Sequence, residues 1–435
     1  MARKRKILLV SYLFPPVGGI GVQRALSLAK YLPQFGYEVH VLQATNAGGP
    51  VYDPGLMRHI PPQVKVHQAL TLEVPFAVRQ KLWSKLSGNG KPTGNRPGQP
   101  SAAKRLVTGA IKRILCPEPE VLWVPFALRK ASAIVRRYGI ECALVTVPPF
   151  SALIVGSALK RRFPNLSVVS DFRDEWLTFY LKDFEFQNTD FTRRRAEAIE
   201  REAVTRSDLV VAVNTSSRDE IRKRYPNEPE GKFAVVPNGY DPEVFAAFRP
   251  RPHNPGKMIV THVGTVYKTA SPRFYLEALD GMPEDVRNRI ETRFVGRISE
   301  TERAQLAGRK SAVQEVGFVA QAEALRYMEE TDYLLLTMTN DISVPGKIFE
   351  YMATRKPVLA IAPPGSEVDR LLRETGAGIC VPPDDLAALR AMIAKAFAAW
   401  NNGTALVTPD GGSITRYERP RLVEEYGRLM ESRRP

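Results

Sequence analysis

The sequence predicts an α/β protein with two domains, each built on a parallel β-sheet. Short apolar segments typical of buried strands alternate with longer segments whose apolar residues recur at helical spacing, the pattern of parallel sheets covered by helices. The chain of 435 residues is too long for one ordinary hydrophobic core, and it suits two domains of about 200 residues each. Residues 249–256 are rich in proline and separate two series of strands.

The elements of each series can be assigned in order. In the first series we expect strands at residues 6–11, 38–43, 143–147, 167–171, 209–213 and 234–237, and helices at 21–35, 151–162 and 193–205. In the second we expect strands at 258–263, 292–296, 333–338, 357–361 and 378–381, with a short helix at 347–354. We expect the charged tail, residues 414–432, to form one long helix.

The composition is that of a globular protein in water, with 44% hydrophobic and 25% charged residues. No stretch approaches the roughly 20 consecutive apolar residues that cross a bilayer. The basic N-terminus runs directly into the first expected strand without the features of a signal peptide, so we expect a cytoplasmic protein. Three scattered cysteines, Cys116, Cys142 and Cys380, fit a reducing compartment and show no metal-ligand spacing.

The formal net charge of +16 predicts attraction to polyanions, which include nucleic acid, anionic membranes and phosphorylated substrates. A nucleic-acid-binding surface needs basic and aromatic residues interleaved on one face. Between Arg79 and Pro117, where the basic residues have no acidic neighbours, Trp83 is the one aromatic residue, and elsewhere the charge is spread along the chain. We therefore expect no nucleic-acid partner.

Residues 74–117 contain nine basic residues and no acidic one. The centre, 87–101, is rich in glycine, proline and asparagine and is predicted to be disordered. Apolar residues on both flanks recur at helical spacing. Two interpretations stay open: residues 78–113 supply basic amphipathic helices that bind an anionic membrane surface, or the flanks are core-facing helices joined by a solvated loop.

The candidate functional residues follow the expected strands, because open parallel sheets bind ligands at the carboxyl ends of their strands. Gly18 and Gly19 lie between the first strand and the first helix, where a glycine turn and a helix N-terminus can accommodate an anion. Their spacing is not that of a dinucleotide fingerprint, so this loop alone fits a tight turn better. Arg173 and Asp174 follow the strand at 167–171. They are either ligand-facing charges or a surface arginine neutralised by carboxylates.

In the second half, Gly264 follows a strand and precedes Lys268, and Gly296 with Arg297 repeats this layout one strand later. A glycine at such a position permits close approach to a phosphate, and a basic side chain supplies charge. Each loop alone is a weak signal. Two of them at the carboxyl edge of one sheet support each other.

The most informative segment is residues 340–353, between two expected buried strands. Pro345 and Gly346 predict a turn, and the helix that follows presents free N–H groups that suit a diphosphate, to which Lys347 adds a charge. Glu350 lies one turn later on the same helical face, where a carboxylate suits the two hydroxyl groups of a ribose. An intrahelical ion pair between Lys347 and Glu350 is the alternative.

Five motifs, taken in chain order, resemble those of the retaining family-4 glycosyltransferases. They are Phe-Pro-Pro-x-Gly-Gly, Asp-Phe-Arg-Asp-x-Trp, Val-Val-Pro-Asn-Gly-Tyr-Asp, Val-Gly-Thr and Pro-Gly-Lys-x-x-Glu-Tyr. The chain is most similar to bacterial members that build polysaccharides and glycolipids. The resemblance implies the GT-B fold, in which two Rossmann-like domains have parallel sheets facing across a cleft. It assigns 1–248 to an acceptor-binding domain, 257–410 to a nucleotide-sugar-binding domain, and 411–435 to a helix that packs back on the first domain.

The resemblance also implies roles for single residues. Glu350 matches the glutamate that binds the ribose, and Lys268 is the candidate that neutralises the diphosphate, aided by Lys347 and by backbone amides at Gly346 and Lys347. Further donor-binding candidates are Gly18, Gly19, Gly264, Arg297 and Pro345. Arg173 and Asp174 are expected on the acceptor side, with Asp174 as a candidate base.

The implied reaction moves a hexose from a nucleoside diphosphate sugar, UDP- or GDP-linked, to a hydroxyl group of a glycan or lipid-linked acceptor, with retention. No Asp-x-Asp motif occurs, so we expect no metal, and no cofactor is implied. One alternative is another GT-B enzyme, such as a nucleotide-sugar epimerase or a phosphorylase. Ile342 stands where many members have a second glutamate, so a non-catalytic nucleotide-sugar-binding homologue is a further alternative.

Overall fold

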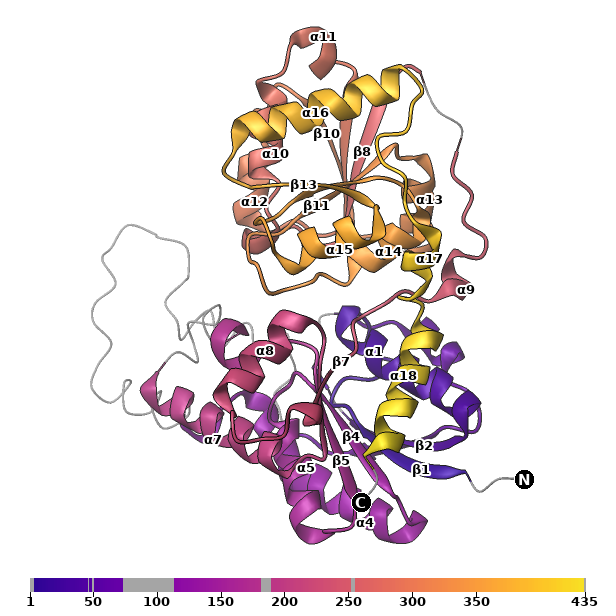
Figure 1. Ribbon diagram of the computed structural model, residues 1–435, viewed down its shortest axis with the longest axis vertical. Coiled ribbons are helices and arrows are strands. Elements are labelled where there is room, and N and C mark those ends of the chain that lie inside the picture. Colours follow the sequence, from indigo (N-terminus) through magenta and orange to yellow (C-terminus); the bar gives the residue numbers. More distant parts are fainter. Residues whose placement is uncertain are drawn as a thin grey trace. The chain divides into compact units, whose positions relative to one another are not determined.

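Figure 1 shows the computed structural model, which describes residues 4–45, 47–48, 51–72, 113–180, 189–251 and 255–433. The prediction of basic amphipathic helices over 78–113 falls almost wholly outside these residues. The chain divides into two compact units, one formed by Met1–Pro237 with Val423–Pro435 and the other by Asn238–Leu422. Each unit is an α/β domain with one parallel sheet, as the sequence predicted.

The first unit has a seven-stranded sheet in the order β3-β2-β1-β4-β5-β6-β7. Neighbouring strands of this sheet pair in parallel. The strands are β1 (Arg5–Val10), β2 (Tyr37–Ala44), β3 (Lys65–Ala69), β4 (Cys142–Val147), β5 (Ser167–Phe172), β6 (Leu209–Ala212) and β7 (Phe233–Val235). The strand order reverses between β1 and β4, and such a switch point is where open α/β sheets bind ligands.

Helices connect these strands. They are α1 (Ile20–Tyr31), η1 (Leu32–Phe35), η2 (Pro54–His59), η3 (Pro119–Trp123), α4 (Val124–Tyr138), α5 (Ala152–Arg162), η4 (Trp176–Tyr180), α7 (Asp190–Arg206), α8 (Thr215–Arg224) and η6 (Glu230–Lys232). The central strand β1 is covered on both faces, since the four consecutive residues Ile7 to Val10 are all fully buried. This double burial explains why the central strands read as continuous apolar runs.

The second unit has a six-stranded parallel sheet in the order β10-β9-β8-β11-β12-β13. Its strands are β8 (Met258–Val263), β9 (Ile290–Val295), β10 (Ala312–Gly317), β11 (Tyr333–Thr337), β12 (Val358–Ile361) and β13 (Gly378–Val381). Its helices are α9 (Pro242–Phe245), η7 (Lys268–Ala270), α10 (Arg273–Asp280), α11 (Glu284–Arg287), α12 (Glu300–Leu306), α13 (Gln321–Glu330), α14 (Lys347–Thr354), α15 (Glu367–Thr375), α16 (Leu386–Asn401) and α17 (Gly411–Thr415).

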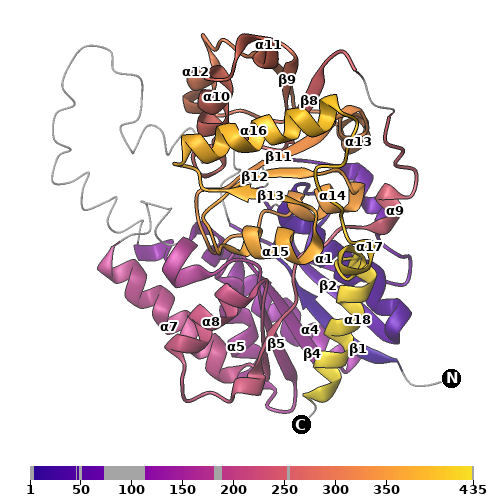
Figure 2. The same cartoon turned by 45° about the horizontal axis from the view of Figure 1, so that its top comes forward.

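Alternate residues of β11 face two different cores of this unit. Tyr333 and Leu335 pack in a core with α10 and α16, whereas Leu334 and Leu336 pack with α14 and α15. Figure 2 shows α16 on one side of the sheet and α14 with α15 on the other. The sheet therefore fixes the position of α14.

The tail is not the single helix that we expected over 414–432. It is divided into α17 and α18 (Arg419–Ser432). Between them the chain pairs with Tyr240, whose amide donates to the carbonyl of Tyr417 at 3.1 Å and whose carbonyl accepts from the amide of Arg419 at 2.9 Å. These two bonds form a β-bridge between Tyr240 and Glu418. Because the backbone groups bond to Tyr240 rather than within a helix, the helix is interrupted here. Within the described residues, no helix has both the length and the apolar character to cross a membrane.

Candidate functional site

The candidate donor site lies at the N-terminus of α14, which follows strand β11. The loop between them is shaped by Asn340, whose side-chain oxygen accepts a hydrogen bond from the amide of Ser343 at 2.7 Å. Gly346 precedes the helix and supplies no side-chain cap. Within the described chain, the amides of Gly346 and Lys347 donate no hydrogen bond. These two donors, together with the helix dipole, favour an anion at this point.

Tyr351 fixes this helix against β8. Its side chain is fully buried, and its hydroxyl group accepts a hydrogen bond from the amide of Val263 at 2.7 Å and donates to the carbonyl of the same residue at 3.1 Å. Sequence reasoning treated Tyr351 only as part of a motif. Its anchoring role depends on tertiary contacts that no local pattern encodes.

Lys347 points back over the end of β8. Its Nζ atom lies 3.0 Å from Nε2 of the buried His262. A side chain at Gly264, whose φ is +124°, would come within 3.2 Å of the same Nζ atom. Burial lowers the pKa of Lys347 to about 7, although the charge of Glu350 opposes this shift. The ammonium group is therefore held near the glycine at the carboxyl end of β8.

Glu350 forms no ion pair with Lys347, so the intrahelical salt bridge considered above is not present. The carboxylate is partly exposed and accepts no hydrogen bond from the described residues. Burial raises its pKa, and the charges of Arg419 and Lys347 act in the opposite direction. The two charged groups on this helical turn are thus separate, and both remain available to a ligand.

Glycines end the three neighbouring strands β8, β9 and β10. Gly264, Gly296 and Gly317 have φ values of +124°, +143° and +86°, which side chains rarely adopt. Gly264 and Gly296 are packed so closely that a Cβ atom at Gly296 would lie 2.3 Å from the carbonyl oxygen of Gly264. The amide of Gly296 also donates to the carbonyl of Gly317 at 2.7 Å. The result is a bare backbone edge beside Lys347.

Two exposed basic residues follow the glycines that end β8 and β9. Lys268 is exposed at the start of η7. Arg297 is exposed and lies over the ring of Phe318, with its guanidinium carbon 5.0 Å from the ring centroid. Phe318 itself is 62% exposed, which is unusual for a large aromatic residue. Sequence reasoning missed Phe318, although its position directly after a strand-ending glycine was a usable signal.

In the first unit, Gly18 and Gly19 lie in the loop from β1 to α1. Gly18 is buried, its amide donates to the carbonyl of Val51 at 2.9 Å, and a Cβ atom there would lie 3.0 Å from the Asp53 side chain. Gly19 is exposed with φ +94°, has open space where a side chain would be, and immediately precedes α1. Close packing thus explains why position 18 is a glycine, whereas Gly19 leaves the N-terminus of α1 accessible.

Arg173 is not a surface arginine neutralised by carboxylates. It is 8% exposed, and its guanidinium group donates to the carbonyls of Val147, at 3.1 Å, and of Gly21 and Pro148. It therefore joins the segment after β5 to the first turn of α1 and to the end of β4. Asp174 follows it, partly exposed and without a hydrogen bond to the described residues. Burial raises the pKa of its carboxyl group, although the charge of Arg173 opposes this shift.

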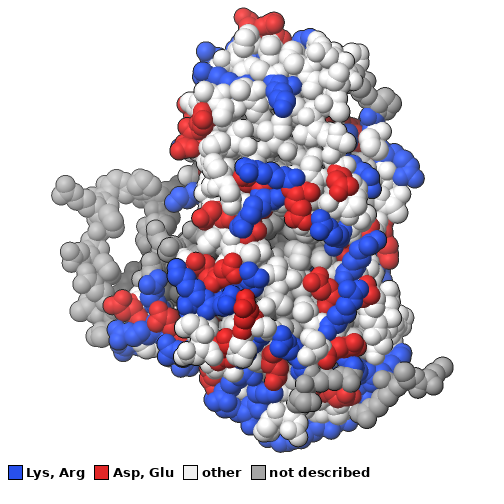
Figure 3. All heavy atoms as spheres, viewed as in Figure 1, with Lys and Arg blue, Asp and Glu red and all other residues white. Residues whose placement is uncertain are grey.

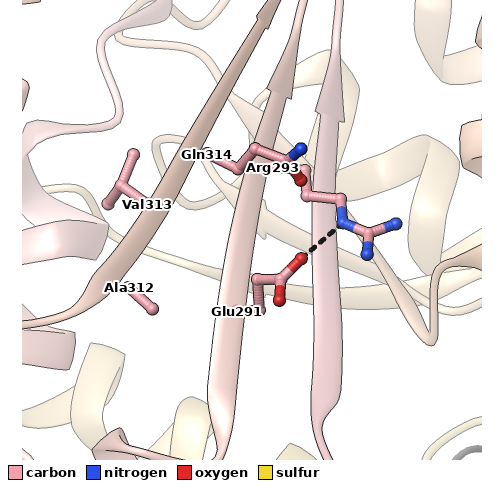
Figure 4. A pocket seen from close by; sticks show the side chains of 5 residues that line it. All are labelled: Glu291, Arg293, Ala312, Val313 and Gln314. Carbon is pink, nitrogen blue, oxygen red and sulfur yellow. Dashed lines mark hydrogen bonds and ion pairs between the residues drawn. The ribbon is translucent and has the colours of Figure 1, made fainter.

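A shallow open pocket occurs elsewhere in the second unit. Figure 4 shows the side chains that line it, which belong to β9 and β10. Arg293 donates to Glu291 at 2.7 Å, and Ala312, Val313 and Gln314 complete the lining. None of the candidate residues contributes to it. These residues lie in the strands, away from the glycines at their carboxyl ends, so we assign the pocket no role.

Two family models match this chain. Residues 91–244 match the model described as Glycosyltransferase Family 4, and residues 257–398 match the model described as Glycosyl transferases group 1. A curated relative, the probable glycosyltransferase WbjE of Pseudomonas aeruginosa, is 42% identical over 52 residues, which is 12% of this chain and only 13% of that protein.

Solved structures match over almost the whole chain. Sucrose-phosphate synthase from Thermosynechococcus elongatus has a TM-score of 0.63 at 14% identity and covers 99% of both chains. Anabaena Alr3699/HepE, solved with UDP and glucose, has a TM-score of 0.61 at 16% identity, covering 98% of this chain and 100% of its own. WaaG, a glycosyltransferase involved in lipopolysaccharide biosynthesis, has a TM-score of 0.61 at 14% identity, covering 98% and 99%.

At these identities the solved structures establish the fold, and the two family models identify the domains that occupy it. Together they confirm the predicted fold class and enzyme class. The chain is therefore a glycosyltransferase of the GT-B fold, in which a Glycosyltransferase Family 4 domain precedes a Glycosyl transferases group 1 domain.

Proposed function

We propose that this glycosyltransferase transfers a hexose from a nucleoside diphosphate sugar to a hydroxyl group of a glycan or lipid-linked acceptor, with retention of configuration. One observation carries the donor half of this proposal. Lys347 lies against Gly264 at the end of β8, α14 begins with amides that donate no hydrogen bond within the described residues, and Glu350 on the same helical turn forms no ion pair there. Cationic, amide and carboxylate groups in this arrangement suit a diphosphate next to a ribose.

The other donor contacts follow from the same edge. Lys268 is exposed near Gly264 in sequence and supplies a second positive charge for the diphosphate. Arg297 and Phe318 form a stacked, exposed pair at the next two strand ends, which suits the face of a nucleobase. HepE was solved with UDP and with UDP-glucose, which supports a uridine nucleotide among the donors to be tested first.

The chemistry requires stabilisation of a departing diphosphate and of a developing oxocarbenium ion. Lys347, Lys268 and the amides of α14 act by preorganised positive charge at the leaving group, so no reorganisation is needed during the reaction. We assign no protein nucleophile. Asp174 is the acceptor-side carboxylate in this proposal, because within the described residues it forms no hydrogen bond and its raised pKa makes it a better base than an ordinary aspartate.

A panel of nucleotide sugars tests the donor. Wild-type protein is mixed with UDP-glucose, UDP-galactose, GDP-mannose and ADP-glucose, and the thermal unfolding midpoint is measured, since a bound donor stabilises by mass action. We expect the nucleotide sugars of one nucleobase to raise the unfolding midpoint of wild type. The Glu350→Ala variant should lose this response. Release of an epimerised nucleotide sugar without acceptor would identify an epimerase instead. Turnover that survives Glu350→Ala would contradict the assignment of this site.

Metal independence is part of the proposal, and it rests on the absence of an Asp-x-Asp motif from the sequence. Transfer is measured in the presence and absence of a chelator, with added Mg²⁺ and Mn²⁺ as the matched controls. We expect equal rates. Loss of activity in chelator and its recovery with one of these ions would overturn this part.

We propose that the acceptor is presented at an anionic membrane surface. Leu70 and Leu72, which precede the basic segment 74–117, are 44% and 59% exposed, and Ile114 near its end is 67% exposed. Exposed apolar residues beside a basic segment suit a membrane interface. The enzyme would then be peripheral on the inner face of the cell membrane. WaaG, named for lipopolysaccharide biosynthesis, supports a glycolipid or polysaccharide product.

Co-sedimentation with vesicles tests this. Wild-type protein should bind vesicles that contain phosphatidylglycerol at low salt, and deletion of 78–113 or high salt should abolish binding. Binding that is unchanged by the deletion would refute the membrane role. Figure 3 shows acidic side chains interspersed with the basic ones over much of the displayed face, which favours such a local membrane contact over a broad nucleic-acid surface.

A further inference from the structure

Strands β8 and β11 pair over a short distance only. Their register pairs Tyr333 with Val260 and Leu334 with Thr261. Beyond this point, buried side chains bond to the backbone of these strands. His262 bonds to the carbonyl of Leu335 through Nδ1 at 3.1 Å, and Tyr351 bonds to Val263 as described above. His262 thus lies within the sheet at the carboxyl edge where the donor site is proposed.

The protonation state of His262 follows from its partners. A carbonyl oxygen only accepts hydrogen bonds, so Nδ1 carries the proton and donates to Leu335. Burial lowers the pKa of His262 well below its usual value, with the charge of Lys347 acting in the same direction, and the ring is therefore neutral. Its Nε2 atom is then an acceptor, and the ammonium group of Lys347 donates to it across 3.0 Å.

We propose that His262 is a positioning residue for donor binding: its neutral imidazole holds the ammonium group of Lys347 over Gly264, facing the diphosphate of the nucleotide. The proposal rests on the function proposed above and adds a residue to it. A lysine side chain has a flexible four-carbon stem, and Glu350 lies at i+3 on the same helix, within reach of an ion pair. Contact with His262 directs Lys347 away from that carboxylate.

A neutral acceptor suits this task better than a carboxylate. An aspartate at this position would hold Lys347 as firmly, but it would cancel the positive charge that the diphosphate needs. Imidazole orients the ammonium group and leaves its charge intact. Gly264 completes the arrangement, because any side chain there would press against the Lys347 stem at 3.2–3.7 Å.

Three substitutions separate the two hydrogen bonds of His262. His262→Gln retains an acceptor near the position of Nε2 and so retains the Lys347 contact. His262→Asn retains a donor near the position of Nδ1 and so retains the Leu335 contact. His262→Phe removes both. Circular dichroism and thermal unfolding check that each variant is folded, and the Asn and Gln variants are matched for loss of the ring.

Binding of UDP and GDP is measured by isothermal titration calorimetry with wild type and each variant. We expect His262→Asn and His262→Phe to weaken binding of the preferred nucleotide about tenfold, the scale of one misplaced charge-assisted hydrogen bond. His262→Gln should stay within about threefold of wild type. Equal affinities for the Asn and Gln variants would overturn the proposal, because a purely structural role does not distinguish the two contacts.

A double-mutant cycle gives the second readout. In a Lys347→Met background, His262→Asn should cause no further loss of nucleotide affinity, since the group that it positions is already absent. Additive losses would contradict a positioning role. If wild-type protein binds neither nucleotide nor any sugar of the donor panel, the proposed function itself fails. If wild type binds and His262→Asn binds equally well, only the role of His262 fails.

Discussion

The hydroxyl group of Tyr351 and the backbone of Val263 form two reciprocal hydrogen bonds, one at 2.7 Å from the amide and one at 3.1 Å to the carbonyl. This pair joins the second turn of α14 to the last residue of β8. Because Lys347 and Glu350 lie on the first turn of the same helix, the contact sets their distance from the glycine edge. The proposed donor site is thus positioned by a buried side chain that is not itself one of the proposed ligand contacts.

Tyr351→Phe removes both bonds and leaves the partly buried amide and carbonyl of Val263 without these partners. We expect a loss of about 1–3 kcal/mol in the free energy of unfolding, the cost of leaving polar groups unsatisfied, together with weaker nucleotide binding. Urea denaturation and calorimetry measure the two effects. Tyr333→Phe is the matched control, since it loses one bond to the carbonyl of Ala396 away from the site. Unchanged nucleotide affinity in Tyr351→Phe would contradict a positioning role for Tyr351.

A second prediction concerns Asp171, at the end of β5. The carboxylate is fully buried and accepts two-pronged hydrogen bonds from Arg24 of α1, from Nε at 3.0 Å and from Nη2 at 2.8 Å. It also accepts from Thr146 and Tyr426. Arg24 in turn donates to the carbonyls of Val236 and Pro237. The network therefore fixes two segments of the first unit. One is residues 236–237, where the chain leaves this unit, and the other contains Tyr426, where the chain returns to it.

Asp171→Asn should destabilise the protein by about 3–5 kcal/mol, because it leaves the guanidinium group of Arg24 buried without its counter-charge. Thr146→Val removes one neutral donor to the same carboxylate and should cost about 1 kcal/mol. Chemical denaturation followed by circular dichroism compares the two. Equal losses for these variants would show that the ion pair does not matter more than a single hydrogen bond.

The third prediction is the pH dependence of donor binding. Burial holds the pKa of Lys347 near 7 rather than at its ordinary value of 10.5, so the ammonium group loses its proton as the pH rises through 7. A bound diphosphate stabilises the charged form. Nucleotide affinity should therefore fall from pH 6 to pH 9, and binding near pH 8 should take up a proton from the buffer.

Calorimetry in two buffers with different ionisation enthalpies measures this proton uptake. Lys347→Gln is the control, because it has no titrating group; its binding should be weaker and independent of pH over this range. A wild-type affinity that does not change between pH 6 and pH 9 would show that the charge of Lys347 does not contact the diphosphate.

The fourth prediction concerns stability and Glu118, which lies outside the donor site. Its carboxylate is 5% exposed and accepts a hydrogen bond from the amide of Ser151 at 2.6 Å. Burial, with the charge of Glu120, raises its pKa to about 8. Between pH 4.5 and 8 the folded state then binds more protons than the unfolded state, so this group makes the protein less stable as the pH rises.

Glu118→Gln keeps an acceptor for Ser151 and removes the titration. Relative to wild type, the variant should gain stability with rising pH, by on the order of 1 kcal/mol per pH unit between pH 5 and 8. Urea denaturation of both proteins at each pH gives the difference between their free energies of unfolding. The contributions of the other titrating groups are the same in both proteins and cancel in this difference. A constant difference across this range would contradict the raised pKa.

The sequence was most informative where pattern and local chemistry agree. The helix at 347–354 was predicted with the bounds that α14 has, because a Pro-Gly turn and an apolar face mark it on both sides. The edge strands β3 and β10 were missed. Both are largely exposed and lack the apolar run that reveals a buried strand.

The partners of the site residues could not be predicted in the same way. Lys347 was paired with Glu350 in one interpretation because the two are close in sequence, yet it contacts His262, which lies on β8. Arg173 resembled a surface charge and instead binds three backbone carbonyls. Such contacts depend on which strands become neighbours, and a single sequence does not encode this locally. The roles assigned to the donor-site residues therefore remain predictions.

The central claim is that the first turns of α14 bind the nucleoside diphosphate of the donor, with Glu350 on the ribose. The most direct test is the dissociation constant of UDP and GDP for wild type, Glu350→Gln and Glu350→Ala, measured by calorimetry. Glu374→Ala is the control, since it changes an exposed carboxylate that contacts Arg416 and Tyr417. We predict that wild type and the control bind one nucleotide equally, and that both Glu350 variants bind it at least about tenfold more weakly. Equal affinity of Glu350→Ala and wild type would contradict the account.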